Sequence, residues 1–198
     1  VKKWKEHDYP EIATRAALEN AVIYWSDETA VKHDSNWVTG YSPKGQTPIL
    51  ERHDGRWRTA TMISAISNQG LLRFKIQDHA MNQESFIEFL EDLIEDEQRK
   101  IFLIVDNLRV HKSKQVQAWT EAHKDRIELF FLPPYSPELN PDEYVNRAVK
   151  TDIRSRAPTT TDKLKKRVNH FMKRMSNSVT KILQIFSNEH VRYAASKP

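Results

Sequence analysis

Two unbroken apolar runs, each closed by an aspartate, most constrain how this chain can fold. The first, AVIYWSDE, ends on Asp27, and the second, KIFLIVD, stops at Asp106. A third run, IELFFLP, is halted by Pro133. Runs without polar alternation predict strands that are buried on both faces, as in parallel sheets covered by helices. The sequence therefore predicts an α/β sheet with carboxylates at the ends of two strands.

The remaining segments predict a hairpin and several helices. WRTATMISAIS and LLRFKIQD are joined by Asn68-Gln69-Gly70, a short glycine-containing connection typical of a β-hairpin. Apolar residues at helical spacing predict helices over 82–98, 112–123 and 142–154, and another in the basic region after Pro158. The order β-β-β-α-β-α-β-α-α predicts a mixed five-stranded sheet flanked by helices, which is an α/β fold.

A length of 198 residues predicts one domain. Residues 1–20 are polar and interrupted by Pro10, and they predict a linker or a short helix that leads into the core. We expect the core over 21–158 and a basic helical region packed on it over 159–198. Because the first residue is Val1 rather than methionine, we expect a piece of a longer protein.

Composition excludes several classes of protein. No apolar run approaches the roughly 20 residues that span a bilayer, and no secretory segment opens the chain, so no membrane partner is expected. The absence of cysteine excludes a disulfide framework, a thiolate zinc site and a cysteine nucleophile, and it fits a reducing compartment.

The charge is unevenly distributed along the chain. The formal net charge is +4, but residues 150–198 hold 12 Lys and Arg against 3 Asp and Glu, whereas the rest has an excess of acid. A basic flank on an acidic body suits a protein that holds cations at one place and binds a polyanion nearby, with an affinity that weakens steeply with salt. The alternative is a basic helix whose charges are only solvated.

Three carboxylates form the candidate catalytic set. Asp27 and Asp106 follow buried strands, and Glu143 lies near the start of a helix that a proline-rich loop introduces. If the two strands are parallel neighbours, their ends meet, and carboxylates gathered there repel one another unless a cation joins them. Oxygen ligands favour Mg²⁺ or Mn²⁺, and two such ions would clamp an in-line displacement at phosphorus. Each acid taken alone also fits a turn or a helix start.

Three segments, taken in order, carry a family resemblance. YWSDE, VDNLRVHKS and LPPYSPELNPDEYVNR resemble the catalytic domain of bacterial insertion-sequence transposases of the mariner superfamily, and the third is the most specific. The loop GYSPKGQTP is also similar to that branch, and the resemblance extends over about 25–195. It implies a DDE transposase with a ribonuclease-H-like fold, whose catalytic core would be residues 21–158.

The resemblance assigns roles to the three acids. Asp27 and Asp106 correspond to the two aspartates of the family, and Glu143 to its closing glutamate. With 36 residues between the second and third acids, Asp142 stays open as an alternative ligand, and Glu138 inside the loop is the weakest candidate. Glu143 is preferred because the final acid of the family stands two places after the proline of Asn-Pro.

The implied activity is DNA transposition. The family hydrolyses phosphodiesters at transposon ends and joins the freed 3′-hydroxyl to target DNA, at TA dinucleotides, with Mg²⁺ or Mn²⁺. The implied cofactor is a pair of these ions, and the implied partners are double-stranded DNA and a second copy of the chain, in the bacterial cytoplasm. Two alternatives stay open: a ribonuclease-H-like nuclease without strand transfer, and a non-catalytic DNA-binding or dimerising fragment of a decayed transposase.

Six side chains are the candidate DNA contacts. The family tends to have a histidine where this chain has His111, and the cations lie in loops or on the helix that follows the third acid. The sequence departs from the family at Leu108 and Arg109, where a small residue and a proline are common. No end-recognition module fits into residues 1–20, so the chain resembles a catalytic domain detached from that module. The candidate contacts are Lys44, Arg109, His111, Lys112, Lys150 and Arg154.

Overall fold

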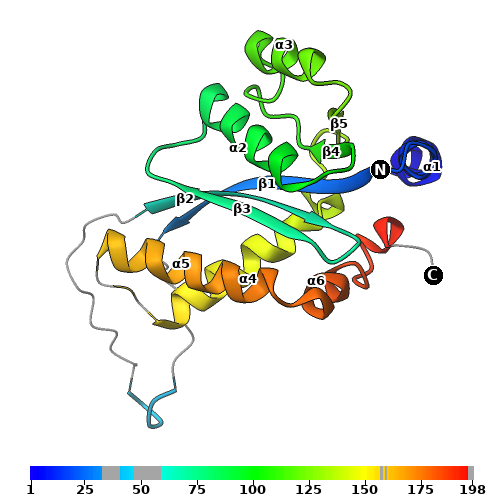
Figure 1. Cartoon of the computed structure of the whole chain (residues 1–198). Helices are drawn as coiled ribbons and strands as arrows, with labels where there is room; N and C mark the ends of the chain where they lie inside the picture. The colour runs from blue at the N-terminus through cyan, green and yellow to red at the C-terminus, as the bar shows by residue number, and fades with distance from the viewer. Residues whose placement is uncertain (33–40, 47–58, 157, 159, 196–198) are drawn as a thin grey trace.

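The computed structural model describes residues 1–32, 41–46, 59–156, 158 and 160–195. Its centre is a five-stranded mixed sheet with the strand order β3-β2-β1-β4-β5 (Figure 1). β2 and β3 form an antiparallel hairpin that pairs with β1, whereas β4 and β5 run parallel to β1. The strands are β1 (Val22–Lys32), β2 (Thr59–Ser67), β3 (Leu72–Gln77), β4 (Ile101–Val105) and β5 (Ile127–Phe131).

Helices cover both faces of the sheet (Figure 1). One layer holds α2 (Gln83–Asp96) and α3 (Lys114–Ala122). The other holds α4 (Asp142–Arg156), α5 (Thr161–Ser176) and α6 (Val179–Ile185). The predicted α/β class, the mixed five-stranded sheet and the flanking helices are confirmed. None of the described helices is long and apolar enough to cross a membrane.

β1 is buried on both faces, as its apolar run predicts. Val22 and Tyr24 pack in the core beneath α2, whereas Ile23 and Trp25 pack in the core on the side of α4 and α5. Successive side chains of a strand point to opposite faces, so a strand between two helical layers must be apolar at every position.

β1 does not end at Asp27, and that expectation is wrong. The strand continues to Lys32 because β2 pairs with it as far as Lys32↔Thr59. Its pairing with β4, in contrast, reaches only Trp25↔Ile104. Asp27 therefore lies just past the point where β1 loses one neighbour and the sheet opens.

The first 20 residues are mainly helical. A π-helical turn (η1, Trp4–Asp8) leads into α1 (Tyr9–Leu18), so the short-helix alternative is the one that the structure has. Trp4, Tyr9 and Ile12 are buried in the core. The Tyr9 ring lies 5.8 Å from Trp25 and 4.9 Å from Tyr193, which joins the two ends of the chain.

The helix boundaries follow local chemistry. α2 begins with a capping box in which the Asn82 side chain accepts from the Ser85 N–H at 2.8 Å and Ser85 Oγ accepts from the Asn82 N–H at 3.0 Å. The predicted apolar stripe of α4 is buried at Val145, Val149 and Ile153. A short 3₁₀ turn (η2, Pro137–Leu139) precedes α4, and another (η3, Arg192–Ala194) follows α6.

The β2–β3 turn packs closely against α6. Gly70 has φ +84°, and a Cβ at this position would lie 2.5 Å from Val179 Cγ1. The predicted hairpin connection therefore requires glycine for both its backbone conformation and the space available.

Candidate active site

A pocket of about 460 Å³ opens where β1 and β4 separate. Asp27, Asp106 and Glu143 line it together with the loop that runs from Leu132 to Pro137. The structure thus brings the three predicted acids to one place, although they are far apart in the sequence.

Strand register accounts for the two aspartates. Trp25 pairs with Ile104 across the parallel strands, and each aspartate lies two residues further along the chain. Asp27 is still within β1, and Asp106 directly follows β4. Positions two apart on a strand share a face, so the two carboxylates leave adjacent strands on the same side. β5 ends at Phe131, and the loop after it leads to α4, which packs on β1 and presents Glu143 from its first turn.

The structure distinguishes the three candidates for the third acid. Asp142 is fully buried and accepts a hydrogen bond of 2.7 Å from Ser64 Oγ on β2, outside the lining of the pocket. Burial raises the pKa of Asp142 well above its ordinary value. Glu138 is exposed and is likewise absent from the lining. Glu143 is the acid of this group that lines the pocket, which favours the preferred assignment.

The environment of the pocket disfavours the ionised form of Asp27. Burial raises its pKa to about 8, and the neighbouring carboxylates of Glu143, Glu28 and Asp106 contribute to the rise. Asn146 opposes it by donating from Nδ2 to Asp27 Oδ2 at 2.7 Å. A bound divalent cation would offset both the burial and the repulsion. A donor set made of carboxylate oxygens fits Mg²⁺ or Mn²⁺.

Asp106 has the opposite shift. Burial alone would raise its pKa, but hydrogen bonds from His111 and from the Leu108 N–H hold the pKa below its ordinary value. The Leu108 bond measures 2.9 Å and the His111 contact 3.1 Å. Asp106 therefore favours its ionised form before a cation arrives.

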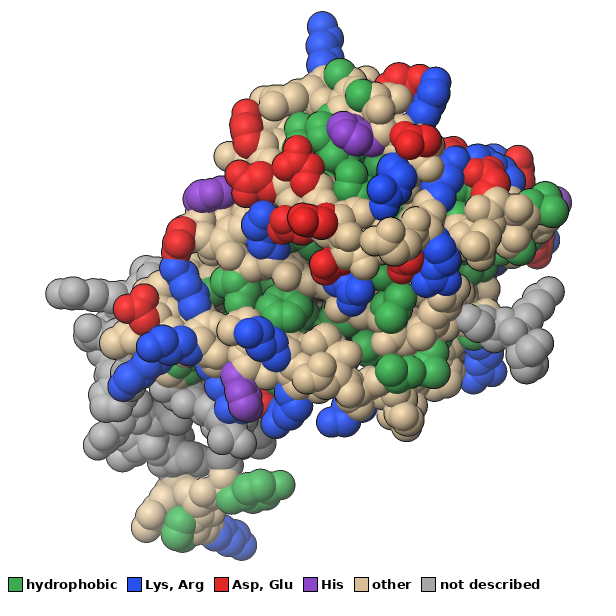
Figure 2. All heavy atoms as spheres, in the orientation of Figure 1, with side chains coloured by type: hydrophobic (Ala, Val, Ile, Leu, Met, Phe, Trp, Pro, Cys, Tyr) green, Lys and Arg blue, Asp and Glu red, His purple; other side chains and the backbone are tan. Residues whose placement is uncertain are grey.

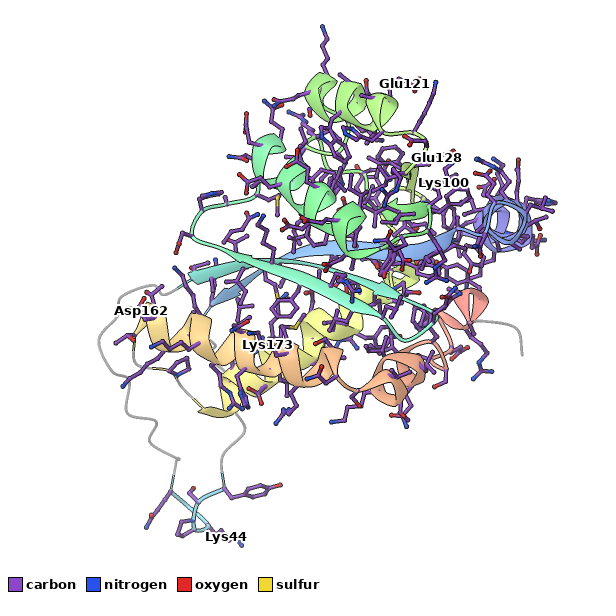
Figure 3. The ribbon with its side chains drawn as sticks, viewed as in Figure 1. Lys44, Lys100, Glu121, Glu128, Asp162 and Lys173 are labelled. Carbon is purple, nitrogen blue, oxygen red and sulfur yellow. The ribbon has the colours of Figure 1, made fainter. Side chains whose placement is uncertain are left out.

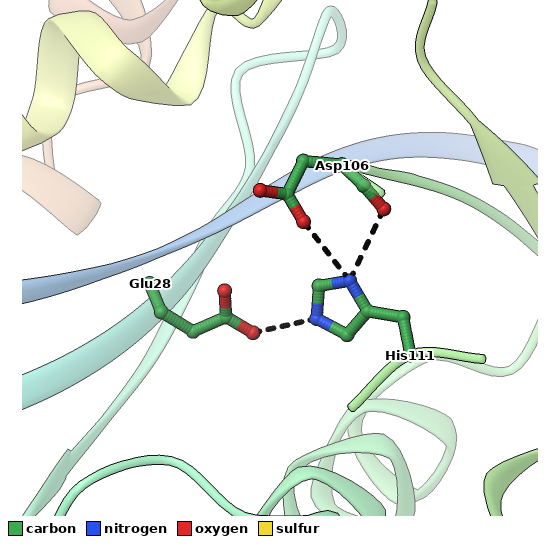
Figure 4. A group of neighbouring side chains, drawn as sticks. All are labelled: Glu28, Asp106 and His111. Atoms are coloured by element: carbon green, nitrogen blue, oxygen red, sulfur yellow. Dashed lines mark hydrogen bonds and ion pairs between the residues drawn. The ribbon is translucent and has the colours of Figure 1, made fainter. Parts of the chain in front are cut away.

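His111 does not lie where a phosphate contact requires it, which corrects the expectation of DNA binding. Its side chain is 1% exposed. Nε2 lies 2.7 Å from Glu28 Oε1, and Nδ1 lies 3.1 Å from Asp106 Oδ1 (Figure 4). Burial would lower the pKa of His111, but its bonds to Asp106 and Glu28 outweigh burial and raise it to about 10. Both ring nitrogens are occupied by carboxylates, so neither is available to DNA.

Sequence reasoning missed Glu28 and Asn146. Glu28 directly follows Asp27 and points to the opposite face of β1, where it meets His111. Asn146 stands three residues after Glu143 on α4, which is the spacing of one helical face. Both residues lie inside segments that carry the family resemblance, YWSDE and LPPYSPELNPDEYVNR, but nothing in these segments distinguishes them from their neighbours.

The predicted cations differ in their position relative to the pocket. Arg109 is exposed in the loop after Asp106, and Lys112 is exposed with Nζ donating to Asn107 Oδ1. Lys150 and Arg154 lie about 10 Å and 16 Å along α4 from Glu143, at 1.5 Å per residue.

Lys44 is not brought to the pocket. It is exposed in the turn formed by residues 41–46, and Figure 3 draws it apart from the sheet. The rest of the loop GYSPKGQTP lies outside the described residues.

The fold resembles solved transposase structures. The chain matches the Mos1 mariner paired end complex with Mn at a TM-score of 0.72 and 14% identity, over 96% of this chain and 60% of that chain. It matches the catalytic domain of Mos1 mariner transposase at a TM-score of 0.59 and 12% identity, over 99% of this chain and 95% of that one. The predicted ribonuclease-H-like fold is thereby confirmed.

Sequence similarity leads to the same group of proteins. A stretch of 79 residues is 34% identical to the insertion element IS630 uncharacterized 39 kDa protein of Shigella sonnei, covering 39% of this chain and 23% of that protein. The chain therefore spans less than a quarter of this relative. Residues 22–165 match the family described as DDE superfamily endonuclease. Since that match extends over most of the chain, the predicted family is confirmed, and the chain belongs to the DDE superfamily endonucleases.

Proposed function

We propose that this chain is the catalytic domain of a transposase that hydrolyses phosphodiesters at transposon ends and joins the freed 3′-hydroxyl to target DNA. The observation that carries the proposal is the convergence of Asp27, Asp106 and Glu143 on one pocket. Burial, with a contribution from the neighbouring carboxylates, raises the pKa of Asp27 to about 8, and this supports the proposal because a structural role gives no reason to gather acids at a cost.

The same three carboxylates would hold two Mg²⁺ or Mn²⁺ ions. When bound, such ions activate the attacking water or 3′-hydroxyl and stabilise the leaving oxygen. Asp27 and Asp106 approach the pocket from adjacent strands, and Glu143 approaches from the helix that packs across β1. Asn146 keeps the carboxylate of Asp27 fixed through its hydrogen bond.

DNA would follow a basic path across the molecule. Arg109 and Lys112 lie beside Asp106, and Lys150 and Arg154 extend along α4, where they would meet phosphate. Figure 2 shows Lys and Arg side chains over the layer of α5 and α6, where Lys166, Lys173 and Lys181 are exposed. Lys44, in the turn formed by residues 41–46, stays a predicted contact.

The proposal includes a homodimer acting on DNA in the bacterial cytoplasm. Joining two transposon ends in one reaction requires two active sites, and a second copy of the chain supplies the second one. The similar Mos1 structures include a paired end complex and a strand transfer complex, which are assemblies of that protein.

The first test is strand cleavage by the full-length parent protein with Mg²⁺ or Mn²⁺. Asp27→Ala, Asp106→Ala and Glu143→Ala should each reduce cleavage by more than about 100-fold, the upper end of what loss of an outer partner of a metal ligand costs. Glu138→Ala is the matched control, because this acid is exposed outside the pocket and should leave cleavage unchanged. Wild-type activity in Asp106→Ala would contradict the mechanism.

Two further assays separate the alternatives. Pre-cleaved ends supplied with a target plasmid should be joined by a transposase, whereas a nuclease of the same fold would leave them unjoined. Calorimetry should detect Mn²⁺ binding at millimolar concentrations, whereas a non-catalytic fragment would give no heat of binding.

A further inference from the structure

A buried histidine stands between the candidate ligand Asp106 and an acid that the proposed mechanism does not use, Glu28. The imidazole of His111 is packed against the Phe86 ring, with 4.4 Å between centroids. Nδ1 contacts both Asp106 Oδ1 at 3.1 Å and the Asp106 carbonyl oxygen at 3.2 Å, and Nε2 contacts Glu28 Oε1 at 2.7 Å (Figure 4). The ring is therefore held at both nitrogens and on one face.

The atoms around the His111 ring determine which hydrogen bonds it makes. Every polar atom that these contacts place on the ring is an oxygen of a carboxylate or a carbonyl, so each ring nitrogen faces a hydrogen-bond acceptor. His111 Nδ1 and the Leu108 N–H both contact Oδ1 of Asp106. Oδ2 is therefore the oxygen left to bind a cation.

Glu28, Asp106 and His111 also have atoms close enough to hold a metal ion themselves, all within 4.8 Å of one another. Two observations favour a different role. A histidine ligand binds through a ring lone pair that points at the metal, and here each ring nitrogen already faces a protein oxygen. Glu28 and His111 also lie outside the lining of the pocket that contains Asp27 and Glu143.

We propose that His111, fixed by Glu28, is a positioning residue that holds Asp106 in the orientation in which it binds the metal. The inference rests on the proposed function, because it gives Asp106 that ligand role. In many metal sites a carboxylate that does not bind the metal orients a histidine that does. Here the roles are exchanged, because the histidine orients the carboxylate that binds the metal. Asp106 requires such a partner because its side chain is 40% exposed and has little packing to hold it.

Two substitutions of His111 separate its two hydrogen bonds. His111→Asn places an amide nitrogen near the position of Nδ1 and keeps the bond to Asp106, whereas His111→Gln places it near Nε2 and keeps the bond to Glu28. Binding of Mn²⁺ to the full 198-residue chain is measured from the free-ion signal in electron paramagnetic resonance. His111→Gln should weaken Mn²⁺ binding by about 10–100-fold, the usual cost of losing an outer partner, and His111→Asn should weaken it less.

Controls exclude a general loss of structure. Thermal unfolding of each metal-free variant is recorded, and the order of the Mn²⁺ affinities should not follow the order of the unfolding temperatures. Equal Mn²⁺ affinity in the two variants would overturn the inference. So would a directly coordinated nitrogen in the spin-echo modulation of bound Mn²⁺, since His111 would then be a ligand.

Asp106→Asn distinguishes failure of the inference from failure of the proposed function. If Asp106→Asn loses Mn²⁺ binding while the two His111 variants behave alike, the metal site stands and the positioning role does not. If Asp106→Asn binds Mn²⁺ like the unsubstituted chain, both are overturned.

Discussion

At the scale of single residues, Asp27 links the pocket to the stability of the fold. Its pKa is 3.8 as an ordinary aspartate and about 8 in the folded, metal-free chain. Between these two values the folded state holds a proton that the unfolded state has released, so the contribution of Asp27 to the free energy of unfolding falls as pH rises. Asp27→Asn cannot titrate and lacks this dependence.

Urea unfolding of the metal-free chain at several pH values between 5 and 8 tests this expectation. The unfolding free energy of Asp27→Asn, relative to the unsubstituted chain, should increase steadily across that range. Other groups with shifted pKa values, such as His111, are present in both proteins and largely cancel. A difference that stays constant with pH would show that Asp27 is already ionised in the folded state.

The same proton governs metal binding. Below pH 8 a cation must displace it from Asp27, so Mn²⁺ affinity should rise with pH by up to about tenfold per unit and level off above pH 8. Isothermal titration calorimetry in buffers of different ionisation enthalpy measures both the affinity and the number of protons released. Binding at pH 6 without proton release would contradict the expectation.

Asn146 is the second residue whose role can be measured directly. Asn146→Leu keeps a similar volume but removes the amide that donates to Asp27 Oδ2 at 2.7 Å. Mn²⁺ affinity should fall by about 10–100-fold, as for other outer partners of metal ligands. Asn177→Leu, at a position directly after α5 and away from the pocket lining, serves as the control and should leave the affinity unchanged. Equal affinities for the two variants would remove Asn146 from the site.

The sequence predicts the acids of this pocket better than the residues that support them. Asp27 and Asp106 end apolar runs that can be recognised without a structure, and Glu143 follows a distinctive loop. Glu28 and Asn146 contact His111 and Asp27, which are 83 and 119 positions away in the chain. Such pairs depend on how strands and helices are stacked, which local pattern does not specify.

At the scale of elements, neighbours decide where a strand ends. The apolar run predicts that β1 stops near Asp27, but β1 continues to Lys32 because the β2–β3 hairpin still pairs with it. The residues of this extension, DETAVK, are too polar to be recognised as part of a buried strand. In contrast, the bounds of α2 and α4 are close to those predicted, since caps and apolar stripes are local signals.

The contact between the hairpin turn and α6 can be tested by a glycine substitution. Gly70→Ala forces a side chain toward Val179, 2.5 Å away, and into a positive φ, so it should destabilise the chain by about 1–3 kcal/mol. Gly45→Ala is the matched control, because Gly45 also has a positive φ, +90°, but a Cβ there meets nothing within 4 Å. Chemical unfolding measures both, and equal losses would show that the turn can move away from α6.

At the scale of the whole molecule, acidic side chains gather at the pocket, whereas exposed basic side chains lie on the helical layer of α5 and α6. Lys166 and Lys173 are exposed on α5, which Figure 3 shows for Lys173. Replacing both by glutamine should reduce the slope of log affinity against log salt by roughly two for double-stranded DNA, about one for each phosphate that is no longer neutralised. Fluorescence anisotropy between about 50 and 200 mM salt measures the slope.

A cation from the other helical layer provides the control. Lys124 is exposed next to α3 and is paired with Glu121 at 2.6 Å, so Lys124→Gln should leave the slope unchanged. If Lys124→Gln lowers the slope as much as the α5 substitutions do, DNA binds without preference for the α5 face. Sequence reasoning could locate the basic region within the chain, but it could not show which of its cations face solvent. Lys165 and Arg167, for example, are engaged by Asp78 and Asp152.

The two ends of the described chain touch, through the Tyr9 hydroxyl and the Ala194 carbonyl oxygen at 3.5 Å. Tyr9 also packs on Trp25 of β1, with 5.8 Å between ring centroids, and the Tyr193 hydroxyl donates to the Leu139 carbonyl oxygen at 2.8 Å. A circular permutant that joins the ends with a short linker and starts in the turn at 41–46 should keep the same architecture.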